Sequence, residues 1–281
     1  MNTTHHNNFH TNKHKLRIYK NDLKYINDFN PETSEFDSEM VESLYHEYNK
    51  KPKIELRIEN SKMESYEYLD LSKLSLNDLL LQQLLSLEKI IYILKKIIFL
   101  DISHNHISKM PDLTNYNNIK YLDVSHNEIN EDILNHNLQE LSCNDNKIIT
   151  INSSSLTRVS ANNNIIKSID IPNLTILLIN DNQLLELSEY QHLEFIECMN
   201  NQISTVANMP SLQELYIANN SITKLQNLPQ LAILNCVNNP IKNIQYFQNL
   251  KLIISSTPSI SSKYKIKTIT KYKNDYLMEL N

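Results

Sequence analysis

The sequence contains no glycine. Phosphate-binding loops, dinucleotide-binding turns, the nucleophile elbow and the EF-hand calcium loop all need glycine where the backbone takes a positive φ angle or approaches a ligand closely. Its absence therefore excludes or badly damages all four kinds of site. Asparagine, the non-glycine residue that best tolerates left-handed turns, occurs 40 times.

The chain also lacks an excess of basic charge. Its 27 Lys and Arg stand against 32 Asp and Glu, for a formal net charge of -5 over 281 residues. A general nucleic-acid binder needs clustered Lys and Arg to replace counterions on phosphates, so we expect no nucleic-acid partner. Residues 251–281 are the exception, with six lysines and two acidic residues. We interpret them as a solvated end, with a weak contact to acidic partners as the alternative.

No segment has the pattern of a membrane-targeting or membrane-spanning element. The first residues, MNTTHHNNFHTNKHK, contain no apolar core, which predicts no secretory signal and an intracellular, cytoplasmic protein. The most apolar run, Leu79–Leu100, is interrupted by amide and charged side chains that are costly at the centre of a bilayer. These are Gln82, Gln83, Glu88, Lys89, Lys95 and Lys96. We therefore expect no membrane insertion.

One sequence frame recurs eight times. Segments such as IKYLDVSHNEI from Ile119 and LQELSCNDNKI from Leu138 share it: apolar, two variable, apolar, one variable, apolar, two variable, Asn, one variable, Ile or Leu. The recurring asparagines are Asn105, Asn127, Asn146, Asn164, Asn182, Asn201, Asn220 and Asn239. Their spacings are 22, 19, 18, 18, 19, 19 and 19 residues, and a fixed period of this kind indicates stacked coils that bury their apolar positions against each other.

This frame resembles the leucine-rich repeat family, strongly over residues 97–244. The resemblance implies an α/β-type solenoid, a superhelix of about eight regular coils with degenerate terminal ones and a parallel β-sheet on its concave face. Repeats of 18 or 19 residues leave little room for a convex helix. Prolines just before the next strand suggest a mostly extended convex side of the polyproline type. Such short repeats resemble those of bacterial effector and internalin-like surface proteins and of some large DNA virus proteins.

The frame assigns a place to each side chain. The second and third apolar positions face the core, and each recurring Asn ends a strand and bonds backbone groups of its own and the adjacent coil as a ladder. The variable positions form two rows on the concave face. The first row is Phe99, Tyr121, Glu140, Arg158, Ile176, Phe195, Glu214 and Ile233. The second row is Asp101, Asp123, Ser142, Ser160, Leu178, Glu197, Tyr216 and Asn235.

The flanks of the repeats depart from the frame. We expect a disordered polar tail at 1–35, a short helix and strand region at 36–65, the solenoid at 66–250 and a degenerate last coil with a cap at 251–281. YEYLDLSKLSL fits the frame except for Leu74 in the Asn position. Leu79–Lys95 is predicted to be one helix capped by Asn77 or Asp78. We expect an extra turn at Ile133 and Leu134, and Pro258 occupies the last Asn position.

Two groups of residues could carry chemistry. Cys143, Cys198 and Cys236 all occupy the third apolar position, which predicts packing in the core rather than a metal or redox role. His104 and His126 precede neighbouring ladder asparagines, above Asp101 and Asp123. This cluster could bind a metal or act as acid and base, although variable exposed positions are often polar by default.

We therefore expect a monomeric, non-enzymatic module that binds a partner protein on its concave face and needs no cofactor or metal. Ile176, Leu178, Phe195, Tyr216 and Ile233 are predicted to be exposed together as apolar anchors. Tyr121 belongs to the same face, and Asp101, Asp123, Glu140, Glu197 and Glu214 would form an acidic rim. Two alternatives remain: residues 1–65 as an effector that the repeats direct to its target, and an enzyme built on the His and Asp cluster.

Overall fold

A computed structural model describes residues 67–134, 137–256, 263, 266–272 and 275–280. The chain divides into two units, Met1–Glu59 and Asn60–Asn281, and every described residue belongs to the second. The expectations for 1–35, 36–65 and Pro258 therefore lie outside the described residues.

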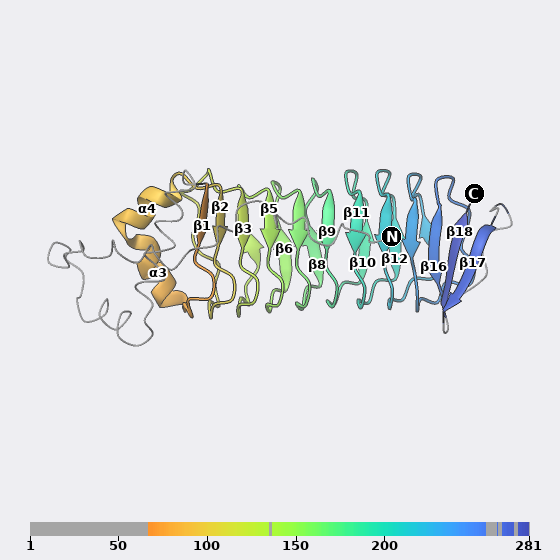
Figure 1. Ribbon diagram of the computed structural model, residues 1–281, viewed down its shortest axis with the longest axis horizontal. Coiled ribbons are helices and arrows are strands. Elements are labelled where there is room, and N and C mark those ends of the chain that lie inside the picture. The colour runs from red at the N-terminus through yellow and green to blue at the C-terminus, as the bar shows by residue number, and fades with distance from the viewer. Residues whose placement is uncertain (1–66, 135–136, 257–262, 264–265, 273–274, 281) are drawn as a thin grey trace, which may run out of the picture. The chain divides into compact units, whose positions relative to one another are not determined.

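Short parallel strands, one from each coil, form one long sheet (Figure 1). The strands are three residues long because the frame places one buried side chain between two variable ones before the chain turns. In sheet order they are β1 (Tyr68–Asp70), β2 (Phe99–Asp101), β3 (Tyr121–Asp123), β5 (Glu140–Ser142), β7 (Arg158–Ser160), β9 (Ile176–Leu178), β11 (Phe195–Glu197), β13 (Glu214–Tyr216) and β15 (Ile233–Asn235).

The sheet continues past the last regular coil. Strand β16 (Leu252–Ser255) pairs parallel with β15, whereas β18 (Asp275–Leu280) pairs antiparallel with β16. Strand β17 (Ile266–Tyr272) pairs antiparallel with β18 and completes the twelve-stranded sheet. Met278 of β18 is fully buried opposite Ile253, so this hairpin covers the edge of the last parallel strand.

The core is a column of apolar side chains that repeats from coil to coil. Leu141 and Cys143 of one coil are fully buried, and Leu122 and Val124 occupy the equivalent positions one coil earlier with 2 % and 0 % exposure. Each coil has too little apolar surface to form a core alone, so stacking on its neighbours supplies the burial that stabilises it.

The eight recurring asparagines are buried or half-buried and bond the backbone of two coils each. Asn146 is representative: its Nδ2 donates to the carbonyl oxygens of Val124, one coil earlier, and of Cys143, over 3.0 and 3.2 Å. Its Oδ1 accepts the backbone N–H of Ile129 over 2.9 Å. Asn105 does the same for the first coil, where its Oδ1 accepts the backbone N–H groups of Leu74 and Leu76.

The helical insert consists of two helices, so the prediction of a single helix is wrong. Helix α3 is Asp78–Ser86 and α4 is Glu88–Leu94, with Leu87 between them in an extended conformation (ψ 131°). The break lets both helices turn apolar residues inward. The buried residues are Leu81 and Leu84 of α3 and Ile90, Ile93 and Leu94 of α4. Asn77 caps α3 by accepting the N–H of Leu80 over 2.9 Å.

The return path of the coils is extended, as expected, but six of its segments are paired β-strands and not polyproline helix. Two small parallel sheets lie there, β4-β6-β8 and β10-β12-β14. Neighbouring coils of nearly equal length place their return segments side by side, so each segment finds hydrogen-bond partners that a polyproline helix lacks. Ile133–Leu134, expected to add a turn, is strand β4. The others are β6 (Thr150–Asn152), β8 (Ser168–Asp170), β10 (Glu186–Ser188), β12 (Thr205–Ala207) and β14 (Leu225–Gln226).

Within the described part of the chain, no helix has both the length and the apolar character that crossing a membrane requires.

Candidate functional site

The outward side chains of the long sheet form two continuous rows. In the first row, Phe99 is opposite Tyr121 and Phe195 lies between Ile176 and Glu214. In the second row, Asp101 is opposite Asp123, and Glu197 lies between Leu178 and Tyr216. The residue between the two rows is buried in every coil, so both rows point away from the core. We call this surface the sheet face.

The sheet face extends one coil beyond the predicted rows at each end. Tyr68 and Asp70 of β1 pair with Phe99 and Asp101, and Leu252 and Ile254 of β16 pair with Ile233 and Asn235. The partial match of YLD in β1 to the repeat frame is the sequence signal for the first of these extensions.

The carboxyl-terminal half of the sheet face carries the apolar cluster, defined as Ile176, Leu178, Phe195, Tyr216 and Ile233. These side chains, predicted to be exposed together, are half-buried. The rings of Phe195 and Tyr216 contact each other with centroids 5.6 Å apart and planes inclined by 41°. Rings on neighbouring strands cover part of each other's surface, and this contact favours one arrangement of the two rings.

Acidic side chains adjoin the apolar cluster but differ in exposure. Glu197, expected on an acidic rim, is 4 % exposed, and its Oε2 accepts a hydrogen bond from Asn180 Nδ2 over 3.2 Å. Glu214 is half-buried and accepts the Tyr216 hydroxyl over 3.0 Å. Burial and the Glu214 charge raise the pKa of Tyr216 above its usual value, so this hydroxyl stays a neutral donor.

The amino-terminal half combines rings and carboxylates. Tyr68, Phe99 and Tyr121 stand in the first row, and Asp70, Asp101 and Asp123 stand beside them in the second. Each carboxylate accepts a backbone N–H two residues later, over 2.8 to 2.9 Å. Burial, and then the Asp101 charge, raise the pKa of Asp123. Between the two halves, the Arg158 guanidinium lies 3.7 Å from the Glu140 carboxylate.

The predicted histidine cluster lies at the turn that follows the strands. His104 and His126 stack with centroids 4.1 Å apart and planes 14° from parallel. The carboxylate at ion-pair distance from His126 is Asp145 of the next coil, at 3.3 Å, rather than Asp123 of its own coil. In the described ranges, no three or more His, Cys, Asp or Glu side chains are grouped so that they could hold a metal ion.

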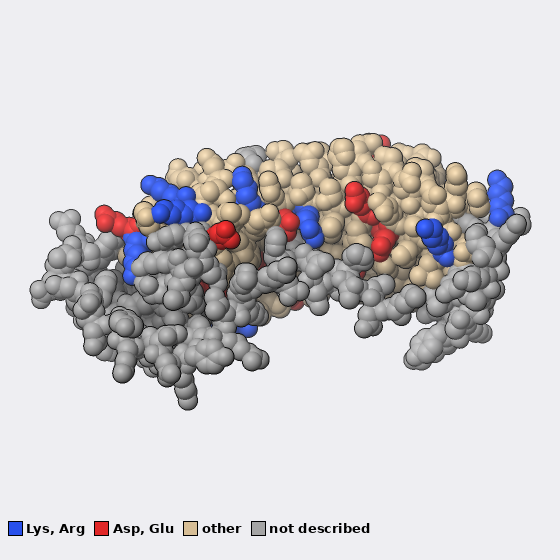
Figure 2. All heavy atoms as spheres, turned by 45° about the horizontal axis from the view of Figure 1, so that its top comes forward, with Lys and Arg blue, Asp and Glu red and all other residues tan. Residues whose placement is uncertain are grey.

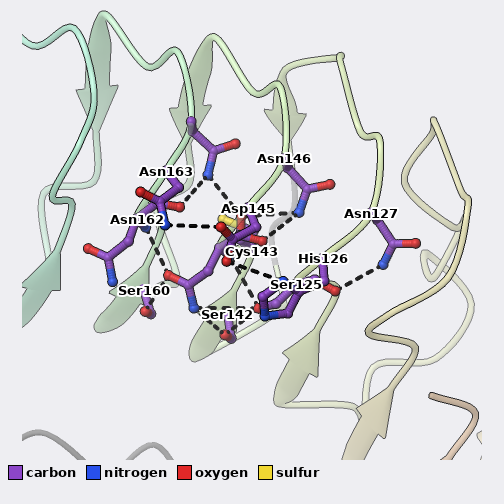
Figure 3. Close-up of polar contacts among 12 residues, drawn as sticks. Ser125, His126, Asn127, Ser142, Cys143, Asp145, Asn146, Ser160, Asn162 and Asn163 are labelled. Atoms are coloured by element: carbon purple, nitrogen blue, oxygen red, sulfur yellow. Dashed lines mark hydrogen bonds and ion pairs between the residues drawn. The ribbon is translucent and has the colours of Figure 1, made fainter. Parts of the chain in front are cut away.

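These turn residues belong to an exposed ladder that sequence reasoning missed (Figure 3). Asn163 Nδ2 donates to Asp145 Oδ1 over 3.0 Å, and the same bond joins Asn200 to Asp181 over 2.8 Å. Asn219 continues the ladder by donating to Asn200. The residue before each ladder asparagine has a φ angle between 53° and 57°. The signal was present: in all eight repeats this position is His, Asp or Asn, residue types found more often than most at positive φ.

The three cysteines are free and buried. Cys143 and Cys198 are inaccessible to solvent, and Cys236 is 2 % exposed. Burial raises the pKa of all three thiols, to about 11 for Cys236. A buried, protonated thiol is a poor nucleophile, so the cysteines serve as small apolar side chains of the core.

Comparison with known proteins identifies the repeat. Residues 210–252 match the family model described as leucine rich repeats in two copies. A search of the curated proteins returned no match. Among solved structures, the LRIM1 leucine-rich repeat domain is similar with a TM-score of 0.54 and 19 % identity, covering 70 % of this chain and 72 % of that one.

Two bacterial structures are also similar, with lower TM-scores. A Shigella effector leucine-rich repeat domain has 20 % identity and a TM-score of 0.44, covering 74 % of this chain and 87 % of that one. An internalin from Listeria monocytogenes has 20 % identity and a TM-score of 0.40, covering 62 % of each. Residues 210–252 therefore match leucine-rich repeats, and the parallel solenoid has the fold of a leucine-rich repeat domain.

Proposed function

We propose that the protein is a non-enzymatic recognition module that binds a partner protein on its sheet face. Leucine-rich repeat folds commonly serve as protein-interaction modules. The observation that supports this face is the in-register array of half-buried apolar and aromatic side chains at Ile176, Leu178, Phe195, Tyr216 and Ile233. Aromatic side chains are enriched among the residues that dominate binding energy, because they bury a large area at a small cost in conformational entropy.

The face is large enough for a specific complex. Eight strands from β2 to β15, about 4.8 Å apart, span roughly 35 Å along the sheet. A protein interface of standard size needs about 800 Å² on each partner. The apolar cluster would form its centre, and Glu140 and Glu214 would contribute to a polar rim. Because the strands fix the spacing of these side chains, little ordering entropy is lost on binding.

The proposal is tested with the double variant Phe195→Ser/Tyr216→Ser. Ile165→Ser/Leu185→Ser is the matched control, because Ile165 and Leu185 are 39 % and 58 % exposed and lie outside the two rows. Each protein is used to capture partners from a lysate of the source cells, and recoveries are compared by quantitative mass spectrometry. We expect the first variant to lose at least tenfold in recovery and the control to lose little.

A photo-reactive amino acid at Ile176 should also cross-link the captured protein, whereas the same group at Leu185 should not. Melting temperature and circular dichroism establish that both variants are folded. Equal recovery with the folded Phe195/Tyr216 variant and the wild type would contradict binding on this face.

A further inference from the structure

The first three strands of the long sheet repeat one tripeptide, an aromatic residue, leucine and aspartate. It reads YLD in β1, FLD in β2 and YLD in β3. The strands pair in register, so Tyr68, Phe99 and Tyr121 are neighbours in the first row. Asp70, Asp101 and Asp123 are likewise neighbours in the second row. We call these six residues the YLD face.

A ring contact and a hydrogen bond join Tyr68, Phe99 and Asp101 of the YLD face. The rings of Tyr68 and Phe99 lie 4.9 Å apart and are inclined by 33°, and the Tyr68 hydroxyl donates to Asp101 Oδ2 over 3.3 Å. All six side chains are half-buried. A ligand on this face would therefore meet the faces or edges of aromatic rings and carboxylate oxygens at the same time.

The aspartates hold negative charge at close spacing. Their backbone bonds use Oδ1 in each case, which orients the carboxylates similarly from strand to strand. Adjacent strands are about 4.8 Å apart, so the carboxylates form a line rather than converging on one point. A calcium ion needs six to eight converging oxygen ligands, and this arrangement does not supply them. A chain of separate cationic groups fits the line better.

We propose that the YLD face binds an arginine-rich segment of the partner protein. A guanidinium group is planar, so it can stack on a ring of the first row and donate paired hydrogen bonds to a carboxylate of the second row. Lysine offers a point charge without the planar match and would bind less tightly. The two rows favour the same ligand for separate reasons. The aromatic row favours a cation stacked on a ring face, and the carboxylate row favours a cationic hydrogen-bond donor.

This inference rests on the proposed function and specifies which kinds of side chain the partner presents to the sheet face. The apolar cluster begins at β9, three strands beyond β3 in the sheet, so roughly 14 Å separates the two regions. The partner would place basic side chains against β1–β3 and apolar side chains against β9–β15. Figure 2 shows acidic and basic side chains scattered over the viewed surface of the described residues, with no large patch of one sign. On that viewed surface, charge of one sign therefore does not select such a partner.

The test uses the full chain and a defined probe, a short blocked peptide of alternating arginine and serine, with its lysine and glutamate counterparts. Affinity is measured by fluorescence anisotropy at low and high salt. We expect the arginine peptide to bind most tightly, the lysine peptide more weakly and the glutamate peptide not at all. Binding should weaken with salt but persist in part, because stacking is screened less than the attraction between exposed charges.

Asp101→Asn/Asp123→Asn should weaken binding of the arginine peptide about tenfold, since two ion pairs of moderate strength are lost. Asparagine keeps an oxygen for the backbone bond, so the fold is preserved. Glu186→Gln/Glu189→Gln removes the same charge from exposed positions outside the rows and should change the affinity little. Phe99→Leu should reduce the preference for arginine over lysine while leaving an apolar side chain in place.

No binding of the arginine peptide, or equal loss in both charge-matched pairs, would overturn the inference. The proposed function is tested separately by partner capture with Phe195→Ser/Tyr216→Ser. If capture needs the apolar cluster but peptide binding does not need Asp101 and Asp123, only the inference fails. If the peptide binds as expected but capture is unaffected by the Phe195 and Tyr216 changes, the location proposed for partner binding fails instead.

Discussion

The carboxamide of Asn164 donates from Nδ2 to the carbonyl oxygen of Cys143, one coil earlier, over 3.0 Å. It also donates to Ala161 in its own coil, and its Oδ1 accepts the N–H of Ile148 over 3.0 Å. One side chain, itself 8 % exposed, therefore satisfies backbone groups of two coils. This bond is repeated along the solenoid and couples the stability of each coil to that of the preceding one.

Asn164→Ala should lower the free energy of unfolding by about 1–3 kcal/mol for each buried backbone group left unpaired. Chemical denaturation measures the change. Asn173→Ala is the control, because Asn173 is exposed and donates a single bond to the Ser154 carbonyl oxygen. The control should cost less than about 1 kcal/mol, and a loss as large as that of Asn164→Ala would contradict the special role of the buried ladder.

Glu189→Asn should stabilise the protein by about 0.5–1 kcal/mol. Glu189 has a φ angle of 67°, which is costly for a glutamate, and it is equivalent to Asn208 and Asn227 in the next two coils. Those two asparagines have φ angles of 59° and 53°, and Asn227 donates to Asn208 over 2.6 Å. An asparagine at 189 would relieve the strain and extend that pair. The melting temperature checks this, with Glu186→Asn as the control, and a decrease for Glu189→Asn would refute the argument.

Asp123→Asn should raise the melting temperature at neutral pH. The pKa of Asp123 is raised above its ordinary value of 3.8, so the folded state holds this proton more tightly than the unfolded state. Stability from this group is present below pH 3.8 and is lost as pH rises through the higher folded pKa. The variant escapes that loss, so its advantage should disappear as the pH falls toward 3.8.

Asp112→Asn is the control of opposite sign. Hydrogen bonds from Thr114 lower the pKa of the exposed Asp112, so its ionised form favours folding and the substitution should not stabilise the protein at neutral pH. Melting curves recorded as a function of pH for both variants measure the difference. A gain that is the same for both would point to net charge rather than to the Asp101 and Asp123 pair.

His104→Asn should reduce the loss of stability in mild acid. Burial, followed by the charges of His126 and Lys73, lowers the pKa of His104 below 6.5. The charges of Asp101 and Asp145 have smaller effects in the opposite direction. The folded state therefore binds this proton less tightly than the unfolded state. Its contribution to stability is lost as pH falls through 6.5 toward the lower folded pKa.

Asparagine tolerates the φ angle of 53° at position 104, so the turn is preserved in this variant. The measurement is the melting temperature between about pH 7.5 and about pH 5. His192→Asn, at an exposed position, controls for the loss of one histidine. If the wild type and His104→Asn lose stability equally in acid, the stacked pair does not set the acid response.

The cysteines should not react with a thiol reagent in the folded protein. Cys143 and Cys198 are fully buried, and burial raises the pKa of each thiol, so neither a thiolate nor an open path to the sulfur is present at neutral pH. Three thiols per chain should react after denaturation in guanidinium. Fast labelling of a residue among the three under native conditions would show that its coil opens locally.

The places where prediction failed have a common cause. Leu79–Lys95 is apolar and periodic enough to predict a helix, but the break at Leu87 depends on packing of both halves against the first coils. The paired return strands escaped prediction because a segment such as Thr205–Ala207 has no strand pattern of its own. It pairs only because Glu186–Ser188 lies beside it in the preceding coil. The exposed turn ladder is built from the His, Asp or Asn before each buried asparagine, and only the structure shows that these side chains bond each other from coil to coil.

What the sequence by itself determined is the repeat, and with it the solenoid fold and the two rows of outward side chains. Coils that repeat every 18 or 19 residues can be stacked in one way that buries every apolar position. The register between strands of neighbouring coils therefore follows from the spacing of the repeats. Only the tertiary structure decided how those side chains share the surface: that Phe195 and Tyr216 are half-buried, that Glu197 is covered and that His126 pairs with Asp145. The exposure of a side chain and its ion pairs depend on residues of the adjacent coil. The sequence of a single repeat does not specify the distances between side chains of adjacent coils.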